Sequence, residues 1–232
     1  MKYSEEYKWI KNNYRYLGLA DRFILGLEFR TKPIDKISEF IPAKGRFLDL
    51  GCGHGGLAYF FARKYPDLEI IGIDPITERI MIAENVFSKP PNLKFQHGKI
   101  EDLNEEGFDA TLLADVECLL TKEEMIKMFE TCYKKTKSGG VFIIKTMNKA
   151  HFFRHFLTIL NSIVLTGAVL ISRMFFRKMS LKKVFGSRQR LIRYYYPEEF
   201  KNLLEKIGWQ VEIYDIPSRF FIFPHIIYLC RK

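Results

Sequence analysis

The chain has 232 residues, of which 47% are hydrophobic, and carries a formal net charge of +10. This length and composition suit one α/β domain with additions, and they exclude a repeat or low-complexity protein. The first residues, MKYSEEYKWIKNN, mix charges with aromatic side chains and lack the apolar stretch of a secretory signal, so we expect a cytoplasmic protein.

Residues 1–44 place aromatic side chains among charges, which predicts amphipathic helices that form a lid over the core. In residues 45–147, short apolar runs alternate with helical stretches of roughly ten residues, which predicts a doubly wound parallel sheet that binds the cofactor. The predicted strands are FLDL, EIIGID, LKFQHG, ATLLAD and VFIIKT, and the predicted helices span residues 56–65, 78–87 and 122–136.

Two further segments follow the last of these strands. Residues 148–193 form a basic, apolar insertion where a short crossover would be usual. Residues 194–232 begin with PEEFKNLLEKIG, a helix that should start at Pro197 and stop at Gly208. WQVEIYDI and FFIFPHIIYL come next, and we expect them to pair as an antiparallel hairpin at the edge of the sheet.

The strongest local signal is FLDLGCGHGG, in which an apolar strand runs into four glycines and then a helix. Glycines let the backbone turn sharply and lie against a ligand. Gly51, Gly53 and Gly56 also satisfy GxGxxG, the short and therefore weak dinucleotide fingerprint. Asp49 argues against a dinucleotide, because a carboxylate gains nothing beside a pyrophosphate but would stabilise a cationic amino-acid moiety.

The second predicted strand ends in Asp74, which could accept hydrogen bonds from the two ribose hydroxyls of either nucleotide. The order DLGCGHG, GIDP, HGKIEDL, FDATLLAD and SGGVFII resembles the motifs of class I S-adenosylmethionine methyltransferases over about residues 45–147. The resemblance returns in YYPEEFKNLLEKIGWQVEIYDI. It implies a Rossmann-like, mostly parallel seven-stranded sheet with an antiparallel edge strand, and S-adenosylmethionine as cofactor.

By matching position, the resemblance also implies which residues bind the cofactor. They are Asp49, Gly51 and Gly53 at the methionine part, Asp74 with Pro75 at the ribose, Lys99, Ile100 and Glu101 near adenine, and Ala114 and Asp115 facing the methyl donor. Lys99 departs from the Asp that many relatives have at this position. For Asp115 and Glu117, a favourable charge at a helix N-terminus is the alternative role.

The sequence does not assign a catalytic base, which phenol or alcohol acceptors need and amines or thiolates do not. In methyltransferases of quinone biosynthesis, which the chain resembles most in its middle and in the position of its insertion, a Glu-His pair often follows the fourth strand. Cys118 and Leu119 stand there instead. The tetrapeptide ADVE also replaces an NPPY-type or DPPY-type motif, which disfavours amide and adenine acceptors. Candidate bases are His54, His97, His151, His155 and Tyr194 to Tyr196.

The positive charge is concentrated, because fourteen Lys and Arg but no acidic residue lie between Glu130 and Glu198. Residues 156–172 carry no charge, so a spanning helix, a packed lid and an in-plane helix are all considered. Polar and apolar residues fall on opposite sides of a helix here, which favours the in-plane arrangement. Residues 151–193 therefore predict reversible binding to an anionic membrane surface, on its inner face, and a lipophilic small-molecule acceptor.

Two other functions remain open. The basic strip and the nearby tyrosines would suit RNA modification, although a nucleic-acid groove does not need the apolar run from Ile163 to Leu170. A non-catalytic binding module on the same fold is the second alternative. The four separated cysteines form no metal-binding pattern, so we expect reduced thiols and no metal site. The leading hypothesis is an S-adenosylmethionine-dependent methyltransferase that acts on a hydrophobic small molecule or lipid.

Overall fold

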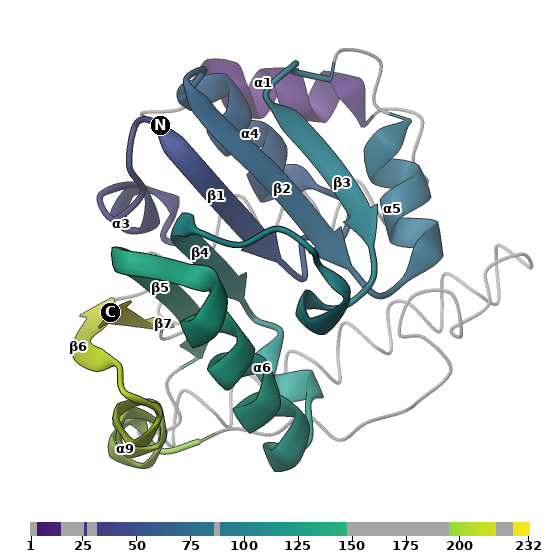
Figure 1. Cartoon of the computed structure of the whole chain (residues 1–232). Helices are drawn as coiled ribbons and strands as arrows, with labels where there is room; N and C mark the ends of the chain where they lie inside the picture. The colour runs from purple at the N-terminus through teal and green to yellow at the C-terminus, as the bar shows by residue number, and fades with distance from the viewer. Residues whose placement is uncertain (1–3, 15–25, 27–31, 86–88, 148–194, 217–224) are drawn as a thin grey trace, which may run out of the picture.

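The computed structural model describes residues 4–14, 26, 32–85, 89–147, 195–216 and 225–232. These residues form a sheet that is covered by helices on both faces (Figure 1). The predicted insertion at residues 148–193 lies outside the described residues, as do His151, His155 and Tyr194 from the list of candidate bases.

The sheet has seven strands in the order β3-β2-β1-β4-β5-β7-β6. Strands β1 to β5 pair in parallel, whereas β7 pairs antiparallel with both β5 and β6. The strands are β1 (Gly45–Leu50), β2 (Leu68–Asp74), β3 (Leu93–His97), β4 (Phe108–Ala114), β5 (Thr136–Met147), β6 (Gln210–Ile216) and β7 (His225–Arg231). The predicted doubly wound, mostly parallel sheet is confirmed, and its antiparallel strand lies one position in from the edge.

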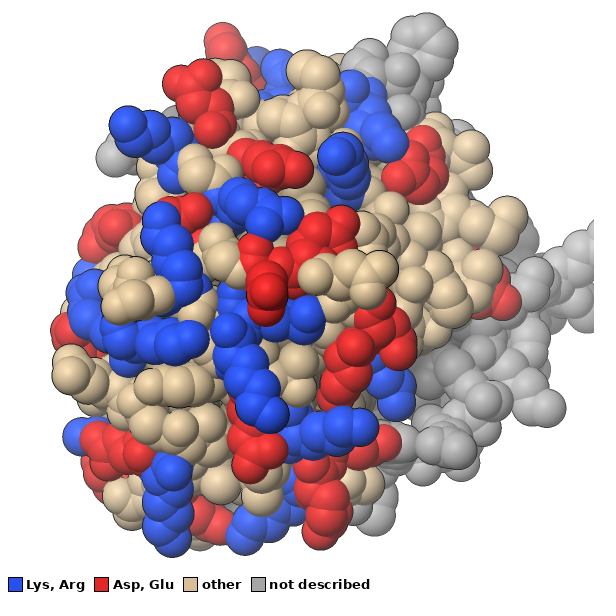
Figure 2. Space-filling model, in the orientation of Figure 1, with Lys and Arg blue, Asp and Glu red and all other residues tan. Residues whose placement is uncertain are grey.

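The helices divide between the two faces of the sheet. One face is covered by α1 (Ser4–Asn13), α3 (Ile34–Ser38), α4 (Gly56–Lys64) and α5 (Thr77–Glu84). The other face is covered by α6 (Lys122–Lys135), α9 (Pro197–Ile207) and the short 3-10 helix η1 (Ile100–Asp102). A second 3-10 helix, η2 (Glu117–Leu119), follows β4. The surface in Figure 2 carries Lys and Arg side chains interspersed with Asp and Glu.

The strands are apolar on both sides because both faces of the sheet are buried. In β1, Phe47 packs into the core beneath α4, and its neighbour Leu48 packs into the core beneath α6; both are fully buried. The same alternation recurs in β5, where Ile143 and Phe142 face opposite cores. Two separate apolar cores therefore hold the parallel strands in register, and this fixes where their carboxyl ends lie.

The predicted antiparallel hairpin at the edge of the sheet is confirmed by β6 and β7. Gln210 pairs with Arg231 and Ile216 pairs with His225, so β7 begins at His225. The prediction began this run at Phe220, but residues 217–224 lie outside the described residues. β6 forms the edge of the sheet, and β7, which follows it in the sequence, lies between β5 and β6.

Helix α1 packs on α4 through aromatic side chains. The Trp9 and Tyr59 ring centroids are 5.4 Å apart, and Tyr14 meets Tyr59 edge to face. The Tyr14 hydroxyl donates a hydrogen bond of 2.6 Å to the carbonyl of His54, inside the glycine-rich loop. The N-terminal helix is therefore tied to the loop that follows β1, while its role as a lid stays a prediction.

Candidate functional site

The residues singled out by the sequence gather at one edge of the sheet. Because β1, β2 and β4 are parallel, their carboxyl ends meet at this edge, where ligands bind in open α/β sheets. The glycine-rich loop leaves the end of β1, Asp74 is the last residue of β2, and Asp115 follows the last residue of β4. The fold thus brings together three segments that are far apart in the sequence.

The glycine-rich loop is fixed by its neighbours on both sides. The Ile73 carbonyl accepts hydrogen bonds from the N–H groups of Gly51 and Cys52, at 2.8 and 3.0 Å. Gly51 has a φ of 74°, and a Cβ on it would come within 2.5 Å of Val116 Cγ2. Only glycine satisfies both the left-handed backbone and this close approach, so the loop turns tightly against the segment after β4.

Gly53 gives the same loop an open side. Its φ is 57°, and no heavy atom lies within 4 Å of the place that a Cβ would occupy. Space therefore exists beside the backbone for a ligand to lie directly against the loop.

Two buried carboxylates lie close to this loop. Asp49 and Asp74 are both almost completely buried. The Asp74 carboxylate accepts hydrogen bonds from the N–H groups of Gly53, at 3.0 Å, and Ile76, at 2.9 Å. Burial raises the pKa of the Cys52 thiol, and the negative charges of Asp49 and Asp74 raise it further, so both carboxylates act on the loop. These two carboxylates, as hydrogen-bond acceptors with negative charge, suit a cationic, ribose-bearing ligand and disfavour a pyrophosphate.

Arg79 is a member of this site that the sequence did not identify. Its Nη1 atom lies 3.6 Å from Asp74 Oδ2. Arg79 is on α5, which follows β2 directly, so a position near Asp74 could be expected from the sequence. Many charged residues are equally close to a strand end, however, and nothing in the pattern marked this one.

The residues predicted to lie near adenine surround η1. The Lys99 N–H donates to Asp102 Oδ2 at 2.9 Å, which caps η1, and the Lys99 side chain is exposed. Ile100 is buried, and Glu101 is half-buried. Pro75 is exposed, and its carbonyl lies 3.2 Å from His97 Nε2. The geometry places these residues at the correct edge, and their contacts with adenine stay predictions.

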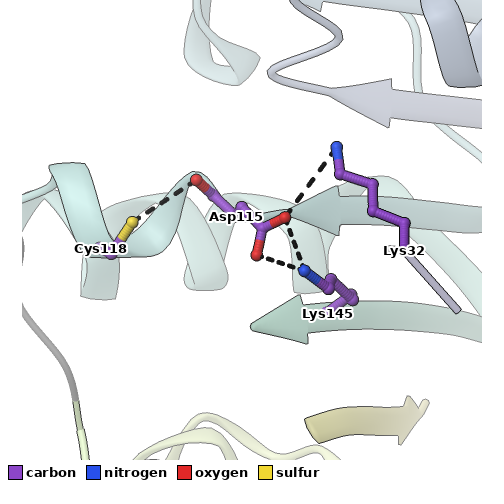
Figure 3. Close-up of polar contacts among 4 residues, drawn as sticks. All are labelled: Lys32, Asp115, Cys118 and Lys145. Carbon is purple, nitrogen blue, oxygen red and sulfur yellow. Dashed lines mark hydrogen bonds and ion pairs between the residues drawn. The ribbon is translucent and has the colours of Figure 1, made fainter. Parts of the chain in front are cut away.

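Asp115 forms an ion pair at the end of β4 (Figure 3). Its Oδ1 and Oδ2 atoms lie 2.6 and 2.7 Å from Lys145 Nζ, and Lys32 Nζ lies 3.9 Å from Oδ2. Lys145 is on β5 and is buried. Burial raises the pKa of Asp115, but the ammonium groups of Lys145 and Lys32 outweigh it and lower the pKa overall. The carboxylate is therefore ionised, and Lys145 is the nearer of its two lysine partners.

Asp115 also has an unusual backbone. Its φ is 62°, the only left-handed value among the described non-glycine residues. Its N–H donates a hydrogen bond of 2.9 Å to the Lys145 carbonyl. Left-handed backbone in a non-glycine residue costs of order 1–3 kcal/mol and persists where the surroundings fix it. Here Lys145 holds both the side chain and the backbone of Asp115.

Glu117 is buried, with 2% of its surface exposed. Burial raises its pKa to about 7, and the nearby Asp115 charge contributes. Glu117 is the first residue of η2, which agrees with the alternative role of a favourable charge at a helix N-terminus. Its side chain is buried, however, and does not point to solvent. The sequence missed this burial because the residue lies in the mixed stretch DVEC, without apolar periodicity.

The positions of the missing Glu-His pair are occupied by residues unsuited to proton transfer. Burial raises the pKa of the Cys118 thiol to about 12, and its Sγ atom lies 3.5 Å from the Asp115 carbonyl. Leu119 is exposed. Within the described ranges, no three His, Cys, Asp or Glu residues gather as a metal site would require. None of the described helices has the length and apolar character needed to cross a membrane.

Comparison with known proteins identifies the family that this site resembles. Residues 47–140 match the family described as "Methyltransferase domain". YqeM of Bacillus subtilis, which is named as a methyltransferase, is 30% identical over 113 residues, 46% of this chain and 44% of that protein. A trans-aconitate 2-methyltransferase of Deinococcus radiodurans is 26% identical over 132 residues, 56% of this chain and 49% of that protein. The matches thus span about half the length of these curated relatives.

A solved structure extends the similarity of the fold beyond the matched residues. The chain superposes on a SAM-dependent methyltransferase from Archaeoglobus fulgidus with a TM-score of 0.60 and 15% identity, covering 86% of this chain and 91% of that one. At this identity the likeness shows the fold alone. It agrees with the strand order and the antiparallel β7 observed here.

Proposed function

We propose that this chain, which carries a class I S-adenosylmethionine-dependent methyltransferase domain, transfers the methyl group of S-adenosylmethionine to a hydrophobic small molecule. The observation that supports this most is the pair of buried carboxylates, Asp49 and Asp74, whose charges both act on Cys52, next to the open Gly53 backbone. S-adenosylmethionine supplies, when bound, a methyl group on a positively charged sulfur.

Each residue of the loop region has a distinct task in this proposal. Asp49 balances the positive charge of the methionine part, and Asp74 accepts hydrogen bonds from the ribose hydroxyls while it holds the N–H groups of Gly53 and Ile76. Gly53 leaves room for the ligand to lie against the backbone. Ile100, Glu101 and Lys99 border the adenine side next to η1.

Asp115 and Ala114 border the transferred methyl group, at the end of β4. The Lys145 ion pair fixes the position of Asp115, so this wall of the site is rigid before any ligand arrives. Alignment and exclusion of water supply most of the acceleration in such a displacement, because the sulfonium is already a good leaving group. A rigid wall therefore contributes to the rate without taking part in covalent chemistry.

A hydrophobic acceptor at a membrane surface follows from the sequence of residues 151–193, in which apolar and basic side chains are interleaved. A quinone precursor and a lipid headgroup are examples of such acceptors. The experiment is to incubate the protein with methyl-labelled S-adenosylmethionine and a cell extract, and then to separate lipids from RNA. We expect the label in the lipid fraction. Label in RNA would instead support the RNA-modifying alternative, and the absence of any labelled product would contradict the proposal.

A further inference from the structure

Glu117 is a buried carboxyl group that the cofactor site does not use. Its Oε2 atom has no hydrogen-bonding partner among the described residues. A buried acceptor that is left unsatisfied costs free energy, and the cost is removed when a donor reaches it. Glu117 Oε2 would therefore gain from meeting an O–H group.

The charges around Glu117 come from the three strands and the short helix that surround it. Asp115, after β4, disfavours its ionised form, whereas Lys145 and a hydrogen bond with Thr146, both on β5, favour that form. Cys118 on η2 and Tyr228 on β7 also lie close, since the Glu117 charge raises the pKa values of both groups. Lys145 already binds both oxygens of Asp115. Its ammonium group therefore offsets the charge of Asp115 first and stabilises the ionised form of Glu117 less.

The position of Glu117 relates it to the methyl-transfer region. It lies two residues after Asp115, and the intervening Val116 is the side chain against which Gly51 turns. The glycine-rich loop, Asp115 and η2 thus form one continuous edge. Cys118 and Leu119 stand where related enzymes often have a Glu-His pair, and Lys145 already binds both oxygens of Asp115. Glu117 is therefore the carboxyl group of this short stretch that has an unpartnered oxygen to offer.

We propose that Glu117 accepts the proton of a phenol-like hydroxyl on the acceptor, an inference that rests on the proposed methyltransferase function. The hydroxyl oxygen forms its bond to the methyl carbon as the bond from that carbon to sulfur breaks. The electron pair of the broken bond stays on sulfur, which becomes a neutral thioether. The hydroxyl proton passes to Glu117 Oε2, and the neutral acid later releases it to water.

The test compares two phenols of different acidity, 4-methylphenol and 4-nitrophenol, as acceptors at pH 8. In Glu117→Gln, which preserves the side-chain volume, we expect kcat/KM for 4-methylphenol to fall by about 100-fold or more, the usual effect of losing a proton acceptor. 4-Nitrophenol is largely ionised in water at this pH, so its methylation should change little. Glu117→Asp should restore part of the lost rate. Glu105→Gln, which removes a half-buried carboxylate that binds Gln96, is the matched control.

The outcomes separate this inference from the function on which it rests. Equal losses with both phenols would show that Glu117 has a structural role only and would overturn the inference. Binding of S-adenosylmethionine without methylation of either phenol would also overturn it but would leave the methyltransferase function intact, whereas failure to bind S-adenosylmethionine would overturn both. If Glu117→Gln does not fold, carbon-13 NMR of the carboxyl groups of the wild type tests the role of Glu117 instead. We expect one glutamate to titrate near neutral pH and to shift when 4-methylphenol binds, and glutamates that all titrate in the ordinary range would contradict the role.

Discussion

Lys145 Nζ lies 2.6 Å from Asp115 Oδ1 and 2.7 Å from Oδ2, so a buried lysine of β5 holds the residue that follows β4. The two residues are thirty positions apart in the sequence and meet because β4 and β5 are parallel neighbours, with Ala114 opposite Lys145. This ion pair sets the geometry at the centre of the candidate site, between the glycine-rich loop and Glu117.

Removal of one partner of this ion pair should be costly. In Lys145→Met, Asp115 keeps its left-handed backbone but loses its main counter-charge, so we expect a loss of about 2–3 kcal/mol in the free energy of unfolding. The double variant Asp115→Asn/Lys145→Met should recover part of this loss, because no uncompensated charge remains. Urea unfolding of both variants and of Asp115→Asn completes the cycle, and strictly additive effects would contradict a coupled pair.

The pKa of Glu117 makes stability depend on pH in a defined window. Its folded-state pKa of about 7 lies above the ordinary value of 4.5. The unfolded chain therefore releases this proton first, and the stability that the protonated group contributes is lost as pH rises from about 4.5 through 7. Glu117→Gln removes this dependence. Relative to the wild type it should gain about 3 kcal/mol between pH 4 and pH 8.

Thermal or urea unfolding of the wild type and Glu117→Gln at several pH values measures this gain. Glu105→Gln controls for the loss of a carboxylate in a less buried place. A difference between Glu117→Gln and the wild type that stays constant over this range would show that Glu117 has an ordinary pKa.

The open side of Gly53 predicts a separation of stability from binding. Gly53 and Gly107 both have left-handed φ values, 57° and 75°, and neither has a heavy atom near the place of a Cβ. Alanine at either position should therefore cost a similar 1–2 kcal/mol of backbone strain. Only Gly53→Ala should weaken binding of S-adenosylhomocysteine, because its methyl group would occupy the space beside the loop. Calorimetric titration of both variants measures this, and equal affinities would show that the ligand does not lie against Gly53.

The membrane proposal can be tested by flotation with anionic vesicles. Residues 151–193 place Phe175 and Phe176 between Arg173 and Arg177. If this segment lies in the membrane interface, the wild type should float with vesicles that contain phosphatidylserine, and replacement of both phenylalanines by serine should abolish flotation. Replacement of Phe152 and Phe153 offers a matched pair outside the basic cluster. A wild type that stays unbound at low salt would contradict the membrane proposal.

The sheet and the glycine-rich loop could be predicted because their signals are local. Apolar runs such as VFIIKT identify strands, and glycines after FLDL identify a tight turn, without knowledge of what packs against them. The ends of helices were predicted nearly as well, since Pro197 begins α9 and Gly208, with a φ of 115°, follows its last residue. The antiparallel pairing of the C-terminal hairpin was predicted as well, and the predicted start of its second strand at Phe220 lies outside the described residues.

The polar contacts of the site could not be predicted in the same way. Lys145 stands at the end of an apolar run, where a lysine could as easily be exposed as buried. Its pairing with Asp115 depends on the strand order, which brings the ends of β4 and β5 together. The burial of Glu117 depends in turn on where η2 places it against β5 and β7. Such contacts arise from the fold, so a single sequence gives their residue types but not their partners.

The most direct test of the methyltransferase function is calorimetric titration of the protein with S-adenosylmethionine, S-adenosylhomocysteine and NAD, with the wild type and Asp49→Asn. Both sulfur compounds should bind and NAD should not, because Asp49 and Asp74 favour a cationic amino-acid moiety over a pyrophosphate. Asp49→Asn should weaken binding of both sulfur ligands by about tenfold to a hundredfold, since a charge-assisted contact contributes roughly 1.5–3 kcal/mol. Binding of NAD alone, or affinities unchanged by the substitution, would contradict the assignment of this site.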